Sequence, residues 1–481
     1  MQIEKTIYWY DLESFGSDPR VDRACQFAGL RTDEALNIID EPLLIYCKPA
    51  LDTLPDPKAC LITGITPQLA LDKGLNEAQF AARIHAEFSE PNTCVAGYNN
   101  LRFDDEITRR LFYRCFYDPY EREWKNGNSR WDIIDLLRMT HALRPDGINW
   151  PRKEDGSASF KLEALTEANH ISHADAHDAL SDVHATIAMA RLVREKQPRL
   201  YDYFYKLRDK HAVIAMLNLD NPEILLHISS RYPASRGCMA PVIPLVLDPS
   251  NPNGFIVYDL SRDPGDWLDA DVETIQSRLF VSNEELPENV ERIGLKTLYS
   301  NRCPAIAPLG VLSPEIKELY GIDLERCEAH RQMLLARPDL KQKLKQVFTS
   351  GFKAETDPDL MLYSGGFFDQ HDRQLMQQCR SLSAEELANF SAEFHDGRLP
   401  ELLFRYRCRN YPESLTKAEL ERWQTFCREK LLFADDEDRN LLGKRSVIEE
   451  KLKNANPEQR LVLEEVNQYI GWLCSELGIQ E

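Results

Sequence analysis

Two acidic residues stand two positions apart near the start of the chain, in Asp11-Leu12-Glu13. They follow the β-branched and aromatic residues 7–10, which predict a strand. Side chains at positions i and i+2 of a strand project from the same face, so the two carboxylates lie side by side. Their repulsion favours a divalent cation between them. Taken alone, such a pair also fits a solvated strand end, because short motifs recur by chance.

A second acidic motif follows a polar turn. Residues 97–106 run from Gly97 through Tyr-Asn-Asn into Asp104, Asp105 and Glu106. The helix dipole favours acids in a first helical turn, and this explanation suits Asp105 or Glu106. It does not explain why three acids stand together, so Asp104 is a candidate ligand.

The third motif joins a histidine to an acid. His177 precedes Asp182 by five positions, and residues five apart on one helix differ by about 140°. If Asp178 caps the helix, His177 lies in the preceding turn and can reach the site that Asp182 faces. We interpret His173 and His184 as surface or packed histidines.

In this order, the three motifs resemble the DEDD exonuclease superfamily in its histidine variant, DEDDh. The stretch 61–67, Leu-Ile-Thr-Gly-Ile-Thr-Pro, is similar to a loop of that family. The resemblance implies phosphodiester hydrolysis by five catalytic residues: Asp11, Glu13, Asp104, His177 and Asp182.

The residue types suit that chemistry. Hydrolysis needs an activated water and stabilisation of negative charge on two oxygens, which two Mg²⁺ ions about 3.5–4 Å apart can provide. Magnesium prefers carboxylate and water ligands, and Mn²⁺ is an expected substitute. We expect Asp11, Glu13 and Asp182 to hold the first ion, and Asp11 with Asp104 to hold the second. His177 is the expected general base, because the ordinary pKa of histidine lies near neutrality.

Alternating strands and helices must position these residues. The runs 7–10, 43–47 and 94–97 predict strands, and 178–194 predicts an amphipathic helix. This pattern predicts an α/β domain with a mixed sheet over residues 1–197.

Two further domains are expected. Short apolar runs separated by Pro, Asn and Gly predict a small β-rich domain with helices over 198–352. Helix-start signals at Ser383, Thr416 and Asn456 predict that 353–481 is entirely helical.

Composition sets limits on the class of protein. The 481 residues carry a formal net charge of −20, which argues against a nucleic-acid partner unless basic residues line one groove. The twelve cysteines form no CxxC pair, so we expect a reducing, cytoplasmic location and no zinc site. We see no apolar leader or span and expect no membrane association.

The likeness extends well beyond the motifs. Residues 97–106, 128–132, 143–150 and 197–200 resemble the bacterial exonuclease I family, and the resemblance covers nearly the whole chain. It implies a ribonuclease H-like α/β exonuclease domain, an SH3-like domain and a helical C-terminal domain. It further implies stepwise release of 5′-mononucleotides from the 3′ end of single-stranded DNA with Mg²⁺, and a strand-enclosing shape that favours processivity. We expect a monomer. The resemblance also implies work in DNA repair and recombination, with single-stranded-DNA-binding protein as a partner.

Basic and aromatic residues interleave over 109–131, as expected where arginines track phosphates and rings stack on bases. We assign Phe112 and Phe116 to the core and favour Arg109, Tyr120 and Trp124 for substrate. Where the family pattern has Arg, this chain has Lys161, which keeps the charge but loses the bidentate fork. The further substrate contacts that the resemblance implies are Glu13, Arg138, Phe160, Lys161 and Lys210.

Three alternatives stay open. An RNA-trimming DEDDh exoribonuclease would share the motifs, although two large extra domains argue against it. A single-strand nucleic-acid-binding protein that has lost activity would share the fold, although all five catalytic positions are filled. In the helical domain, we interpret Arg405, Tyr406, Arg407 and Arg409 as a solvated basic face, with a dock for an acidic partner tail as the alternative.

Overall fold

The structure is a computed structural model that describes residues 4–173, 178–282, 284–288, 290–349, 355–433 and 437–480. The described chain forms two compact units that cut across the predicted domains. The first holds the described parts of 1–129, 173–185 and 354–481, and the second those of 130–172 and 186–353.

A mixed sheet lies at the centre of the first unit, in the order β3-β2-β1-β4-β5. Strand β1 pairs antiparallel with β2 and parallel with β4. The parallel pairing ends at Trp9 opposite Ala96, so Asp11 and Glu13 extend beyond the end of β4. The strands are β1 (Thr6–Ser14), β2 (Ala24–Asp33), β3 (Leu43–Tyr46), β4 (Thr93–Gly97) and β5 (Ser129–Asp132), and the first stretch of the first unit ends within β5, at Ser129.

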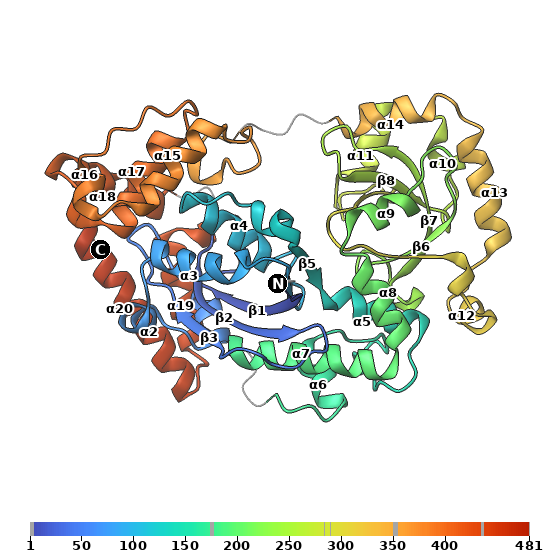
Figure 1. Ribbon diagram of the computed structural model, residues 1–481, viewed down its shortest axis with the longest axis horizontal. Coiled ribbons are helices and arrows are strands. Elements are labelled where there is room, and N and C mark those ends of the chain that lie inside the picture. The colour runs from blue at the N-terminus through green and yellow to red at the C-terminus, as the bar shows by residue number, and fades with distance from the viewer. Residues whose placement is uncertain are drawn as a thin grey trace. The chain divides into compact units, whose positions relative to one another are not determined.

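The two faces of β1 have different partners (Figure 1). Tyr8, Tyr10 and Leu12 are buried in a core that α3 (Glu77–Ser89) and α4 (Asp104–Arg114) close. The other face lies against the first turns of α7 (Ala179–Lys196), whose Ala179 N–H donates to Gln26 Oε1 of β2 over 3.4 Å.

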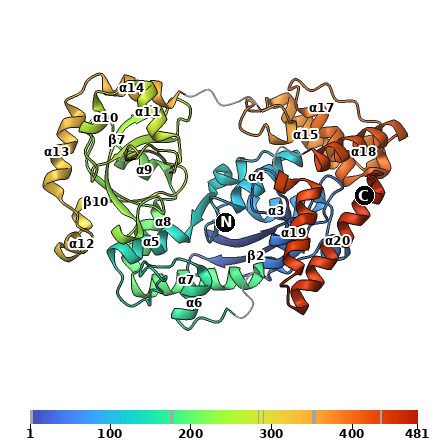
Figure 2. The same cartoon turned by 180° about the vertical axis from the view of Figure 1, so that it is seen from behind.

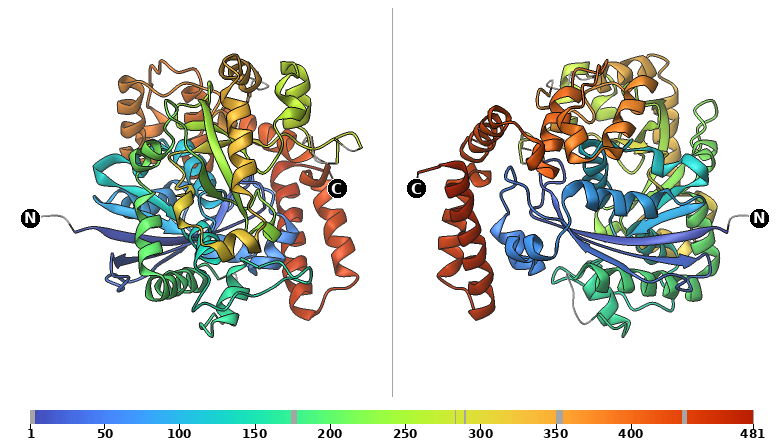
Figure 3. Two further views of the ribbon diagram at one scale, coloured as in Figure 1. Left: turned by 90° about the vertical axis from the view of Figure 1, so that its right-hand side faces the viewer. Right: turned by 60° about the vertical axis from the view of Figure 1, so that its left-hand side comes forward.

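The C-terminal part of the first unit contains only helices among its described residues 355–433 and 437–480. Helices α19 and α20 lie side by side (Figures 2 and 3), and α20 contacts both α1 and α2, with Phe15, Ile65, Leu463 and Ile470 in their shared core. The predicted capping boxes at Ser383 and Thr416 are present, and Asn456, predicted only as a helix start, also forms a capping box. The helices are α1 (Pro57–Thr63), α2 (Pro67–Lys73), α15 (Gln370–Ser381), α16 (Ala384–Ala388), α17 (Leu399–Asn410), α18 (Lys417–Leu432), α19 (Leu441–Leu452) and α20 (Pro457–Leu477).

The interpretation of α17 as a solvated basic face is wrong. Arg405 and Arg409 are buried, at 6% and 9% exposure, as is Tyr406 at 3%. Arg405 pairs with Asp359, and Arg409 with Asp359 and Asp52. Arg407 lies partly buried with Glu419. These arginines of α17 therefore pair with carboxylates inside the first unit.

The second unit is built on an antiparallel sheet in the order β10-β6-β7-β8-β9. Helices α11 and α14 cover it and share its apolar core (Figure 1). The strands are β6 (Leu225–Ile228), β7 (Met239–Leu247), β8 (Gly254–Asp259), β9 (Leu295–Tyr299) and β10 (Ala305–Pro308). The helices are α5 (Ile133–Leu143), α6 (Leu162–Ala168), α8 (Pro198–Lys206), α9 (Lys210–Met216), α10 (Gly265–Leu268), α11 (Val272–Leu279), α12 (Pro314–Leu319), α13 (Leu324–Leu335) and α14 (Leu340–Phe348).

Among the described helices, none is both long enough and apolar enough to cross a membrane.

Candidate active site

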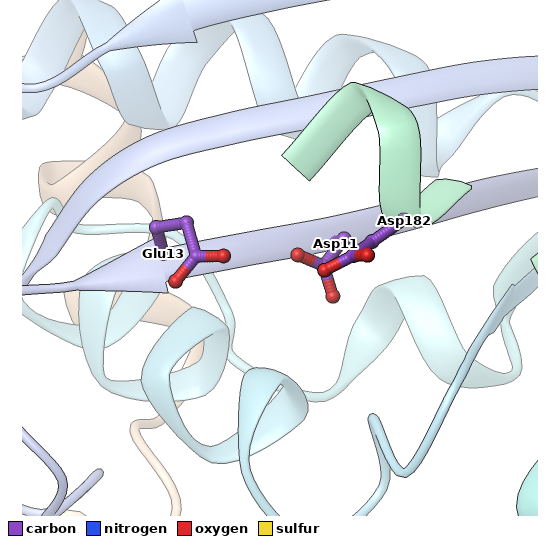
Figure 4. Close-up of side chains that lie close together, drawn as sticks. All are labelled: Asp11, Glu13 and Asp182. Carbon is purple, nitrogen blue, oxygen red and sulfur yellow. The ribbon is translucent and has the colours of Figure 1, made fainter. Parts of the chain in front are cut away.

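Three of the predicted residues meet between β1 and α7. Asp11, Glu13 and Asp182 each offer a carboxylate oxygen, and these oxygens lie within 4.8 Å of one another. Figure 4 shows Asp11 and Glu13 on β1 and Asp182 reaching them from α7. This is the one such group among the residues that the structure describes.

Local structure explains why these side chains converge. Alternation along β1 puts Asp11 and Glu13 on the face that α7 approaches. The Asp178 carboxylate accepts from the Ser181 N–H over 3.2 Å, as expected of a cap, and Asp182 N–H closes the first turn on Asp178 O at 3.0 Å. Asp182 therefore lies in the first turn of α7, over the end of β1.

Burial and mutual repulsion together set the electrostatics of the site. Burial, followed by the charges of Asp104, Glu13 and Asp182, raises the pKa of Asp11 well above its ordinary range. Burial and the charges of Asp182 and Asp178 raise the pKa of Glu13 to about 7. No cationic side chain is among these causes. The donor set is all oxygen and all acidic, which fits a hard divalent cation such as Mg²⁺.

Asp104 is a fourth carboxylate next to this group. It is the first residue of α4 and is buried, at 5% exposure. Its charge is the largest electrostatic cause of the raised Asp11 pKa. The turn after β4 thus brings the second predicted motif to the first.

The predicted general base cannot be placed, because His177 lies outside the described residues. His173, which we interpreted as a surface or packed histidine, is packed with its side chain only 3% exposed. Its Nε2 lies 2.5 Å from Asp182 Oδ1. Sequence reasoning missed this contact because the histidine lies nine residues before its partner, outside the helix. His184 is exposed, as expected.

Of the three predicted substrate residues of the first unit, Arg109 and Tyr120 contact each other, and Trp124 is exposed. The guanidinium of Arg109 faces the Tyr120 ring at 5.5 Å, and it is held by Glu123 (2.7 Å) and Glu106 (2.8 Å). Trp124 is 65% exposed. Phe112 and Phe116 are fully buried, and their assignment to the core is confirmed.

The remaining predicted contacts lie in the second unit. Arg138 faces the Phe160 ring at 5.7 Å and pairs with Asp135. Trp150, which we did not single out, lies 6.2 Å from that ring. Lys161 directly precedes α6 as its N-cap residue and Lys210 is the first residue of α9, and both are exposed.

Known protein families match three successive parts of the chain. The exonuclease family matches residues 8–190. The exonuclease I SH3-like domain matches 208–350, and the exonuclease I C-terminal domain matches 356–473. With the acidic cluster between β1 and α7, this defines the class: the chain is an exonuclease.

Similar proteins narrow the class further. Exodeoxyribonuclease I of Escherichia coli K12 is 45% identical over 422 residues, covering 87% of this chain and 88% of the relative. That of Haemophilus influenzae is 46% identical over 429 residues, covering 89% and 90%. The chain therefore belongs to the exonuclease I family and is an exodeoxyribonuclease. The predicted order of an α/β exonuclease domain, an SH3-like domain and a helical domain is confirmed.

Solved structures of exonuclease I are similar to this chain over nearly its full length. Exonuclease I from Methylocaldum szegediense has a TM-score of 0.92 at 49% identity, covering 98% of this chain and 99% of that one. E. coli exonuclease I in complex with a dA16 oligonucleotide has a TM-score of 0.93 at 42% identity, covering 98% and 100%. A zinc-bound form of an E. coli complex with single-stranded DNA scores 0.92 at 42% identity, covering 98% and 99%.

Proposed function

We propose that this enzyme degrades single-stranded DNA from the 3′ end and releases 5′-mononucleotides. The observation that carries the proposal is the cluster of Asp11, Glu13 and Asp182, whose repulsion needs a cation. The single-strand complexes of the E. coli relative support the choice of substrate.

Two Mg²⁺ ions, or Mn²⁺ in their place, would polarise the phosphodiester and lower the pKa of a bound water. Asp11, Glu13 and Asp182 would hold the first ion, and Asp11 with Asp104 the second. Their chain geometry supports this role, because β1, α4 and α7 are rigid elements whose ends converge. His177 would accept the proton of the attacking water, and His173 would orient Asp182 through its hydrogen bond.

Aromatic and basic side chains would guide the strand. Trp124 offers an exposed ring on which a base can stack, and Tyr120 a partly buried one. Arg109, which two carboxylates hold, would act on the strand through the Tyr120 ring that it faces. Further proposed contacts are Glu13, Arg138, Phe160, Lys161 and Lys210.

The cellular setting follows from the family alone. We propose a cytoplasmic, processive monomer that acts in DNA repair and recombination and meets single-stranded-DNA-binding protein. Because Arg405 and Arg409 are already paired inside the first unit, a partner's acidic tail would bind elsewhere.

Digestion of end-labelled strands tests the reaction. Matched 5′- and 3′-labelled single-stranded DNA, duplex and RNA would be incubated with Mg²⁺ and with EDTA. We expect mononucleotides from the 3′ end of single-stranded DNA alone, and no product in EDTA. Equal or faster trimming of RNA would mean that the protein is an RNA-trimming exoribonuclease. Binding without cleavage would mean that it is a single-strand nucleic-acid-binding protein.

Paired variants test the choice of base. His177→Ala should lower kcat by roughly 10²–10⁴-fold, since that is the usual contribution of general acid–base catalysis. His173→Ala should lower kcat less and should weaken metal binding, because His173 contacts a proposed ligand. If His173→Ala abolished turnover while His177→Ala kept it, the two roles would be exchanged.

A further inference from the structure

Strand β1 carries the site on one face and a buried tyrosine on the other. Asp11 and Glu13 face α7, whereas Tyr10 projects to the opposite face, because neighbouring residues of a strand alternate. There the Tyr10 ring packs on Phe27 and Phe88, with centroids 5.9 and 5.0 Å away. Tyr10 is thus adjacent to Asp11 in the chain, but its side chain lies outside the site.

The first turn of α4 also places one residue toward the site and the next residue in the core. Asp104 directs its charge to the site, and the next residue, Asp105, is fully buried in the core. The Asp105 carboxylate accepts a hydrogen bond of 2.7 Å from the Tyr10 hydroxyl and one of 2.6 Å from Arg122 Nη2. The Asp105 N–H donates to Asn100 O over 2.9 Å, which fixes the backbone of the turn as well.

Core packing alone does not require this contact. The side chains of Arg122 and Asp105 are both 0% exposed. The desolvation of such a pair offsets much of its attraction, and apolar replacements are often no less stable.

We propose that Tyr10, Asp105 and Arg122 form a positioning triad that fixes Asp11 against Asp104. The triad ties β1 to the first turn of α4 through one carboxylate, and each tied segment carries a site carboxylate on the adjacent residue. A slip of β1 along α4 would separate those two carboxylates, and a site loosened by about 1 Å loses function. The proposal rests on the metal-binding roles proposed above for Asp11 and Asp104.

Tyr10→Phe tests the triad, because it removes one hydroxyl and keeps the ring in the core. We expect Mn²⁺ binding to the full-length protein, followed by electron paramagnetic resonance, to weaken roughly tenfold, as for other residues that support metal ligands. We expect kcat on single-stranded DNA to fall by a similar factor, with KM little changed.

Tyr8→Phe is the matched control. Tyr8 lies on the same face of β1, is 2% exposed, and its hydroxyl has no hydrogen-bond partner among the described residues. It should match wild type in Mn²⁺ affinity, kcat and KM. Asp105→Asn adds a conservative variant that still accepts from Tyr10 but loses the charge facing Arg122, so its Mn²⁺ affinity should fall between wild type and Asp105→Ala.

Two outcomes would overturn the triad. The first is a Tyr10→Phe protein that, measured well below its melting temperature, has the Mn²⁺ affinity and kcat of wild type. The second is a Tyr10→Phe protein whose melting temperature falls while its Mn²⁺ affinity and kcat do not change. Asp11→Asn, measured alongside, keeps this test separate from the proposed function. Unchanged Mn²⁺ binding in Asp11→Asn would refute the metal site itself, whatever Tyr10→Phe does.

Discussion

Glu13 links the charge of the site to the stability of the protein. Its pKa is raised from 4.5 to about 7 by burial and by Asp182 and Asp178. Between these values the folded state binds more protons than the unfolded state, so stability falls as pH rises through this window. A bound divalent ion removes the repulsion and reverses the loss.

We therefore expect the melting temperature in EDTA to fall from about pH 5 to about pH 8, by an amount worth on the order of 2 kcal/mol. Glu13→Gln should flatten this fall, and Mg²⁺ should raise the melting temperature of wild type more than that of the variant. Glu421→Gln, at an exposed position of α18, is the control. A wild-type curve that rises over this range in EDTA would contradict the electrostatic account.

Trp124 is the residue whose exposure suits base stacking best. With a side chain 65% exposed, it can be removed without opening a cavity. Trp124→Ala should weaken single-stranded DNA binding by about 1–3 kcal/mol and leave the melting temperature unchanged. Trp472→Ala, at 41% exposure on α20, supplies the control, measured by fluorescence anisotropy. Equal affinities for the two variants would exclude Trp124 from the strand path.

At the residue scale, the sequence predicted which carboxylates converge better than it predicted which ion pairs form. Asp11, Glu13 and Asp182 were found because strand alternation and a capped helix fix where their carboxylates point. The Glu106 and Glu123 partners of Arg109 were not foreseen, because an ion pair depends on how a later loop folds back.

The turn that links β4 to α4 is sensitive to one added methyl group. A Cβ at Gly97 would lie 2.8 Å from the Tyr10 carbonyl oxygen and 2.9 Å from Asn100 Cβ. Gly97→Ala should therefore cost about 1–3 kcal/mol of stability. It should also lower kcat, because it displaces the residue before Asp11.

Gly366→Ala serves as the control, since a Cβ there meets nothing within 4 Å. Chemical denaturation and steady-state turnover would measure both effects. Wild-type stability and kcat in Gly97→Ala would mean that β1 adjusts freely, contrary to a rigid site.

Elements with strong local signals were predicted, and those without them were not. The helix starts at Thr66 and Asn456 follow from their caps and prolines. Strand β2 was missed, because Ala24–Asp33 contains Gly, Gln and Arg and is defined instead by its pairing with β1. The runs at 43–47 and 94–97 became β3 and β4.

A buried ion cluster holds the C-terminal helices to the first part of the chain. Asp52, fully buried, accepts from Arg23 at 2.8 Å and from Arg409 and Lys430 at 2.9 Å. Although burial opposes ionisation, these cations hold the pKa of Asp52 well below its ordinary range. Its contribution to stability is thus present above about pH 4 and is lost as pH falls below that value.

Asp52→Asn should destabilise the protein by about 3–5 kcal/mol, because it removes the buried negative charge that Arg23, Arg409 and Lys430 share. Arg422→Gln should cost at most about 1 kcal/mol, since Arg422 is 58% exposed in its pair with Glu401. Urea denaturation compares the two. Similar losses in both variants would mean that the cluster does not hold these helices.

The sequence could predict the order of domains but not this cluster. Domain order follows from local texture and from motifs, whereas Asp52 and Arg409 are 357 positions apart. Their proximity depends on how α17 packs. Because the sequence does not show this packing, its run of arginines predicts a solvated face.

Mn²⁺ titration of wild type and of Asp11→Asn, with turnover of 3′-labelled single-stranded DNA in the same samples, tests the central claim most directly. The account predicts saturable binding and metal-dependent cleavage in wild type. In a folded Asp11→Asn protein it predicts binding weakened at least roughly tenfold and no cleavage. Wild-type Mn²⁺ affinity and turnover in that variant would contradict the assignment of the acidic cluster as the active site.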